Sequence, residues 1–135
     1  MTIEIDHLGI AVRNIDEGLL FYQGLLGMPL AGRENVDGER VNVAMLPAGA
    51  GKDAPRIELL EATGDDSAIA RFIDKRGPGL HHIALRVDDL QSAVEHLTAA
   101  GARLVNELRE GAAGHKYVFV HPASTGGVLL ELIQK

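Results

Sequence analysis

The chain contains an internal duplication, and this duplication constrains its fold more than any other feature of the sequence. When the second half is laid over the first with a shift of about 75 residues, His82 falls on His7, and Glu131 falls close to Glu58. Self-similarity of this kind indicates that one supersecondary unit is formed twice. The matched segments are 5–12 with 80–87, 43–47 with 118–122, and 57–59 with 130–132.

Each half reads as one strand, one helix and three further strands. In the first half Asn14 is the expected N-cap of a helix and Gly27 is expected to end it. In the second half Asp89 and Gly101 occupy the same places. Two short strands complete the pair of units, and they are expected at residues 28–34 and 103–109.

A connecting helix is expected between the halves, from Asp66 to Arg76, because the Gly-Pro-Gly sequence that follows would end it. The sequence therefore predicts a first βαβββ module, a connecting helix with linker, and a second βαβββ module, which together form one domain. Their bounds are 1–64, 65–79 and 80–135. The expected fold class is α+β, in which the tandem repeats form a curved eight-stranded sheet around a metal-centred cleft, with the helices outside.

Two histidines and two glutamates occupy matched positions of the repeat. Side chains of a strand point alternately to its two faces, and the apolar neighbours of all four residues predict that they lie on the unpacked face. Imidazole and carboxylate groups together suit divalent transition metals. A single histidine or glutamate in a strand more often has a structural or solvent-facing role, but four at matched positions predict a metal site. The expected ligands are His7, Glu58, His82 and Glu131.

Charge and composition exclude several other classes of protein. The formal net charge is −6, from 13 basic and 19 acidic residues, and the basic residues are scattered, so nucleic-acid binding is not expected. No apolar run reaches the roughly eighteen residues of a membrane span, and the first residues lack the basic and apolar regions of a secretory signal. The absence of cysteine excludes disulfides and thiolate metal sites. A soluble, cytoplasmic protein with no membrane partner is therefore expected.

Three segments resemble the vicinal oxygen chelate superfamily, which includes glyoxalases, bleomycin resistance proteins and dioxygenases. Segments 5–12 and 79–84 are shared with relatives such as glyoxalase I, whereas segment 121–132 is more specific and resembles the methylmalonyl-CoA epimerase family. The resemblance implies interconversion of the (R) and (S) epimers at C2 of methylmalonyl-CoA, by metal-assisted abstraction and return of a proton. It also implies a divalent metal, with cobalt expected and zinc, nickel or manganese as alternatives, an acyl-CoA substrate and a homodimer.

The resemblance also suggests roles for individual residues. Asn42 stands where we expect the catalytic glutamate of a characterised epimerase, so Glu131 and Glu58 are the expected acid and base, with Glu39 in the adjacent loop as a further candidate. Asn42 is placed on the cavity side of its strand together with Ala44. The expected substrate-binding residues are Asn42, Arg86 for an anionic group, and Lys116 for the CoA phosphates.

Other activities stay open at this point. A ligand set of two histidines and two glutamates is also similar to that of glyoxalase I, so a lactoylglutathione lyase is the main alternative. A non-catalytic binding protein of the same superfamily is the second, although three Phe, two Tyr and no Trp are few for a sequestering pocket. An extradiol dioxygenase uses two histidines and one carboxylate, and the additional Glu58 disfavours it. The sequence does not decide whether a site forms within one chain or across a dimer.

Overall fold

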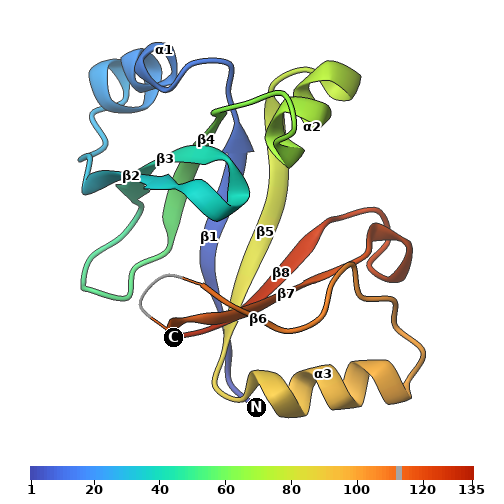
Figure 1. Ribbon diagram of the computed structural model, residues 1–135. Helices are drawn as coiled ribbons and strands as arrows, with labels where there is room; N and C mark the ends of the chain where they lie inside the picture. The colour runs from blue at the N-terminus through green and yellow to red at the C-terminus, as the bar shows by residue number, and fades with distance from the viewer. Residues whose placement is uncertain (112–113) are drawn as a thin grey trace. The chain divides into compact units, whose positions relative to one another are not determined.

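The structure is a computed structural model that describes residues 1–111 and 114–135 (Figure 1). Its strands are β1 (Ile3–Ala11), β2 (Gly32–Val36), β3 (Val41–Pro47), β4 (Arg56–Ala62), β5 (Gly79–Val87), β6 (Arg109–Glu110), β7 (Lys116–Val120) and β8 (Leu130–Gln134). Its helices are α1 (Ile15–Leu19), α2 (Ala68–Arg76) and α3 (Leu90–Ala99), and a π-helix (Leu20–Leu25) continues α1. Hydrogen bonds join the strands in the order β2-β3-β4-β1-β5-β8-β7-β6, so the predicted α+β class with an eight-stranded sheet is confirmed. Among the described residues, no helix is long and apolar enough to cross a membrane.

Contacts within the chain divide it into two compact units. One unit comprises residues 7–81, and the other comprises residues 1–6 and 82–135. The division passes through β1 and β5, whereas the sequence repeat has its boundary in the linker before residue 80. The module bounds 1–64, 65–79 and 80–135 therefore describe the repeat, and as folding modules they stay a prediction.

In the unit of residues 7–81, both faces of the strands are apolar and each is covered by a helix (Figure 1). Strands β1 and β4 pair in parallel, and β4, β3 and β2 follow as an antiparallel meander. The face under α1 is built from Ile15, Leu19, Ala44, Leu46 and Leu59. The opposite face packs against α2 and is built from Ala11, Val41, Val43, Leu60 and Ile69. Neighbouring residues of β3 are therefore buried on opposite faces of the strand.

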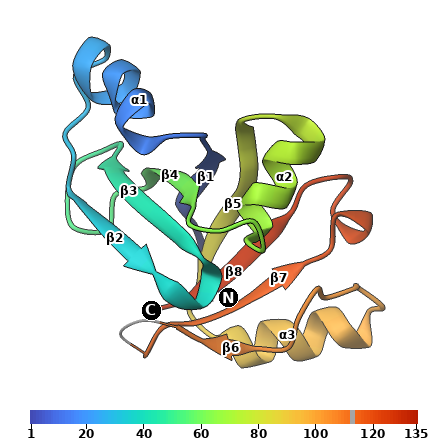
Figure 2. The same cartoon turned by 45° about the horizontal axis from the view of Figure 1, so that its top comes forward.

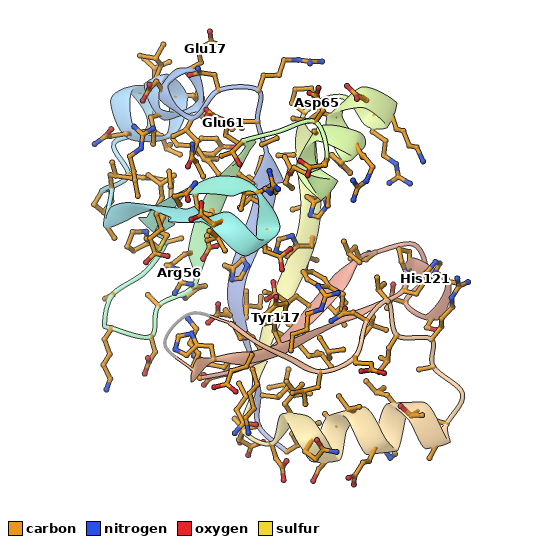
Figure 3. The ribbon with its side chains drawn as sticks, in the orientation of Figure 1. Glu17, Arg56, Glu61, Asp65, Tyr117 and His121 are labelled. Carbon is orange, nitrogen blue, oxygen red and sulfur yellow. The ribbon has the colours of Figure 1, made fainter. Side chains whose placement is uncertain are left out.

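Two side-chain caps define the start of α1. The predicted cap is confirmed, because Asn14 Oδ1 accepts a hydrogen bond from the backbone N–H of Glu17 at 3.0 Å. The second cap is Glu61, whose Oε1 accepts a hydrogen bond from the backbone N–H of Ile15 at 2.7 Å. Glu61 belongs to β4, and Figure 3 shows it at the end of that strand near α1. The helix is thereby anchored to the sheet as well as capped.

The helix that begins at Ile15 changes from α to π geometry after Leu19, which the sequence analysis did not predict. The N–H of Leu26 donates to the carbonyl of Phe21, five residues earlier, at 2.8 Å. The predicted end of this helix at Gly27 is confirmed by the positive φ of Gly27, 81°, a value that residues other than glycine rarely adopt.

The connecting helix predicted between the halves is present as α2. Ser67 caps it, with its Oγ accepting a hydrogen bond from the N–H of Ile69 at 3.1 Å. Gly77 follows the last residue, Arg76, with a positive φ of 76°. The predicted start at Asp66 is thus two residues early, because Asp66 and Ser67 precede the first helical turn.

In the unit of residues 1–6 and 82–135, α3 lies along one face of the strands (Figures 1 and 2). Strands β5 and β8 are parallel, and β8, β7 and β6 are antiparallel. The predicted cap Asp89 accepts a hydrogen bond from the N–H of Ser92 at 3.1 Å, and Gln134 Oε1 of β8 accepts one from the N–H of Leu90 at 2.7 Å. The repeat therefore extends to the two caps of each helix. The cluster beneath α3 is formed by Val87, Leu90, Val118, Val120 and Leu132.

The two short strands differ from their prediction. β2 begins four residues later than expected, and β6 shares only Arg109 with the segment predicted at 103–109. In the rest of that segment a single bridge joins Leu104 to Val120. Asn106 Oδ1 accepts a hydrogen bond from the backbone N–H of Phe119 at 3.0 Å. In a continuous strand, a backbone carbonyl would accept this hydrogen bond instead.

Candidate functional site

The structure brings His7 and Glu58 together in the unit of residues 7–81. Parallel pairing of β1 with β4 sets Gly9 opposite Glu58, and this register puts His7 Nδ1 3.5 Å from Glu58 Oε2. The two side chains are 7% and 12% exposed, so both polar groups are nearly buried. Leu59 packs beneath α1, and strand alternation therefore places Glu58 on the opposite face, as the sequence predicts.

The structure brings His82 and Glu131 together in the same way in the unit of residues 1–6 and 82–135. Parallel pairing of β5 with β8 sets Ala84 opposite Glu131, and His82 Nε2 lies 3.2 Å from Glu131 Oε1. Their side chains are 7% and 11% exposed. The imidazole of His82 also packs edge to face against Phe119, with ring centroids 5.6 Å apart, which restricts its orientation.

The donor chemistry of each pair fits a divalent cation. Within each pair, one imidazole nitrogen and one carboxylate oxygen lie within 4.8 Å of each other, so a single ion can contact both. In the described part of the chain, no buried side-chain nitrogen or oxygen lacks a hydrogen-bond partner. Each unit therefore holds one pair of possible metal ligands whose burial is compensated.

Arg56 is a neighbour of the His7–Glu58 pair that the sequence analysis did not identify. It lies two residues before Glu58 on β4, and strand alternation therefore gives the two side chains the same face. Arg56 Nε and Nη2 both donate to Glu58 Oε2, at 3.1 and 2.7 Å. The spacing of two residues was the available signal, but a charged residue at the start of a strand usually indicates a solvated position.

Arg86, predicted to meet an anionic part of the substrate, is bonded to two carboxylates of its own unit. Its Nη2 lies 2.6 Å from Glu4 Oε2, and its Nη1 lies 3.2 Å from Asp6 Oδ1. Lys135 Nζ also lies 2.9 Å from Asp6 Oδ1, and the Asp6 side chain is fully buried. Arg86 thus balances a buried charge in this structure, and its contact with substrate stays a prediction.

The prediction that Asn42 lies on the same face as Glu58 is wrong. Asn42 is opposite Glu61 in the strand register, and Glu61 caps α1, so both lie on the α1 face. Its Oδ1 accepts a hydrogen bond from Asn35 Nδ2 at 2.9 Å. Val43 shares the face of Glu58 instead. Alternation was misread because β3 is apolar on both faces, and the expected role of Asn42 in binding substrate is not favoured by this geometry.

The two remaining candidates lie at the edges of their units. Lys116 is exposed at the start of β7, opposite Glu110 on β6. Glu39 is half-buried in the 3-10 turn (Asp37–Glu39) that precedes β3. Contact of Lys116 with the phosphates of CoA and an acid or base role of Glu39 stay predictions.

Comparison with known proteins identifies consistent relatives. Residues 6–119 match the family model described as the Glyoxalase/Bleomycin resistance protein/Dioxygenase superfamily. The Bacillus subtilis protein YqjC is 38% identical over 96% of this chain and 91% of its own length. The structure of methylmalonyl-CoA epimerase from Mycobacterium tuberculosis superposes with a TM-score of 0.85 at 40% identity, over 96% of this chain and 86% of that one. A methylmalonyl-CoA epimerase in complex with methylmalonyl-CoA and NH4+ superposes with a TM-score of 0.91 at 33% identity, over 100% and 96%.

Proposed function

The chain belongs to the glyoxalase/bleomycin resistance protein/dioxygenase superfamily, and we propose that within it the protein is an epimerase that interconverts the two C2 epimers of methylmalonyl-CoA. The observation that carries this proposal is the buried histidine–glutamate pair, which occurs once in each unit at matched positions of the repeat. Similarity over nearly the whole chain to epimerases, one of which was solved with methylmalonyl-CoA, supports the choice of an acyl-CoA substrate.

We propose that the two pairs together hold one divalent cation. Its ligands would be His7, Glu58, His82 and Glu131, a set of two nitrogen and two oxygen donors. When bound, the cation supplies positive charge next to the thioester oxygen, where negative charge develops as the C2 proton leaves. Cobalt is the metal that the family resemblance favours, and zinc, nickel and manganese accept the same donors. Elemental analysis of the purified protein tests both the presence and the identity of the metal.

Epimerisation requires removal of a proton on one face of C2 and its return on the other, and hence two acid/base groups. Glu131 and Glu58 come from equivalent strands of the two repeats, so each half contributes one carboxylate. On the face of β3 that Glu58 shares, Val43 and Met45 carry no acid or base. The proton transfers therefore fall to Glu131 and Glu58, and Glu39 is the alternative donor from the adjacent turn.

The test is exchange of the C2 proton of methylmalonyl-CoA with deuterated water, followed by NMR or mass spectrometry. With each pure epimer as substrate and the metal supplied in excess, we expect Glu131→Gln to abolish exchange of one epimer and Glu58→Gln to abolish exchange of the other. Full exchange by Glu131→Gln would remove this residue from the mechanism. The unmodified protein should be inactive on the thiohemiacetal of methylglyoxal and glutathione. Turnover of this thiohemiacetal without turnover of methylmalonyl-CoA would support the lactoylglutathione lyase alternative.

A protein that only binds a small molecule is the remaining alternative. It would bind methylmalonyl-CoA without exchanging its C2 proton, even in the presence of excess metal. A homodimer and a cytoplasmic location stay predictions from the sequence, and light scattering of the purified protein tests the first.

A further inference from the structure

Arg56 contacts a proposed metal ligand directly, because two of its hydrogen bonds fall on one oxygen of Glu58. Nε and Nη2 donate to Oε2 at 3.1 and 2.7 Å, and His7 Nδ1 lies 3.5 Å from the same oxygen. The side chains of Arg56 and Glu58 are 20% and 12% exposed. Figure 3 shows Arg56 at the start of β4. A donor that occupies Oε2 restrains the carboxylate and directs Oε1 to any further partner.

We propose that Arg56 is a positioning residue that holds Glu58 by Oε2, and that its positive charge weakens the binding of a divalent cation to this group. The inference rests on the proposed function, because it requires Glu58 to be a metal ligand. It adds to that function a residue that sets how tightly the metal is held and how much of its charge stays available to the substrate.

The direction of the effect follows from elementary electrostatics. A guanidinium keeps its positive charge at all ordinary pH values, so the Arg56–Glu58 pair is formally neutral. A cation bound to the other oxygen of Glu58 would lie within a few ångströms of that guanidinium, and the repulsion is poorly screened because both side chains are largely buried. Removal of Arg56 restores the full negative charge of Glu58, and the metal should then bind more tightly.

A purely structural role of Arg56 would change the metal affinity in the opposite direction. If Arg56 only stabilised the fold or the rotamer of Glu58, its removal would loosen the ligand and weaken metal binding. The sign of the change in affinity therefore separates the two roles, independently of catalytic activity.

The experiment is a titration of the metal-stripped full chain with Co²⁺ or Zn²⁺ in competition with a chromogenic chelator. We expect Arg56→Gln to tighten binding by about tenfold or more, because one like charge close to the cation is removed. Arg56→Lys keeps the charge and should stay within about threefold of the unmodified protein. The matched control is Arg33→Gln, which breaks an equally short pair with Asp16 at 2.7 Å in the same unit, where the side chains are 47% and 75% exposed. This control should leave the affinity unchanged.

Weaker or unaltered binding in Arg56→Gln would overturn the inference. Adding Arg56→Gln to Glu58→Gln tests whether Arg56 acts through Glu58. Without the carboxylate, the guanidinium is no longer held at the site. The gain in metal affinity from Arg56→Gln should therefore largely disappear in this background. A gain of full size in that background would show that Arg56 does not act through Glu58. If the unmodified protein binds no metal, or Glu58→Gln binds it equally well, the proposed metal role of Glu58 fails, and the inference fails with it. If only the Arg56 variants behave unexpectedly, the proposed function stands.

Discussion

Replacement of Asp6 by Asn should destabilise the fold by removing the negative charge that two cationic side chains share. Arg86 Nη1 and Lys135 Nζ lie 3.2 and 2.9 Å from Asp6 Oδ1, and the Asp6 side chain is 0% exposed. The amide has nearly the same volume as the carboxylate, so packing changes little. What changes is the charge, because two cations then lie beside a neutral group in a poorly solvated place.

The expected loss follows from how exposed the cations are. Breaking a fully buried ion pair costs about 3–5 kcal/mol, but Lys135 is 27% exposed and can turn towards water, and Arg86 keeps its bond to Glu4. We therefore expect Asp6→Asn to lower the free energy of unfolding by about 2–3 kcal/mol. In a chain of this length that corresponds to a fall in Tm of roughly 8 °C.

Urea unfolding monitored by circular dichroism measures this loss, and Glu4→Gln is the matched control. Glu4 contacts the same arginine at 2.6 Å but is 60% exposed, so its replacement should cost less than about 1 kcal/mol. Equal losses for the two variants would contradict the reasoning, since burial would then not decide the strength of the interaction.

Three further outcomes are expected. Leu59→Ala removes a fully buried side chain beneath α1 and should lower the free energy of unfolding by about 3 kcal/mol, measured by thermal or urea unfolding. Hydrogen bonds from the backbone N–H and the hydroxyl of Ser92 lower the pKa of Asp89 below its ordinary value of 3.8, so this cap favours the folded state above pH 3.8 and loses its effect as the pH falls through the lowered value. The difference in Tm between the unmodified protein and Asp89→Asn should accordingly shrink in acid. Removal of bound metal with a chelator should lower Tm, and restoring the metal should recover it.

The sequence predicted those parts of the fold in which one local signal dominates. Asn14 and Asp89 were identified as caps because their side chains satisfy backbone donors that any helix start exposes. The faces of His7 and Glu58 relative to α1 were predicted, because apolar neighbours of opposite parity mark the side that packs under this helix. These signals act within a few residues and need no knowledge of tertiary contacts.

Prediction failed where two signals compete or where the decisive partner is distant in sequence. Val43 and Ala44 are both apolar and both buried, on opposite faces of β3, so the pattern does not reveal which face Asn42 occupies. The segment predicted as a strand at 103–109 is interrupted by the Asn106 side chain, which bonds a residue thirteen positions away. The caps from Glu61 and Gln134 likewise depend on strand pairing that only the fold supplies.

The duplicated halves differ at the position two residues before each proposed catalytic carboxylate. The position two residues before Glu58 is Arg56, whereas the position two residues before Glu131 is Leu129. The first carboxylate is therefore held by a guanidinium on one of its oxygens, and the second repeat places no charge at the equivalent position. A carboxylate restrained on one oxygen has less freedom to turn towards C2, while proton transfer requires an oxygen that can reach C2 and accept its proton. The asymmetry thus favours Glu131 as the more mobile of the two acid/base groups and Glu58 as the more restrained one, although symmetry of the repeat alone would make them equivalent.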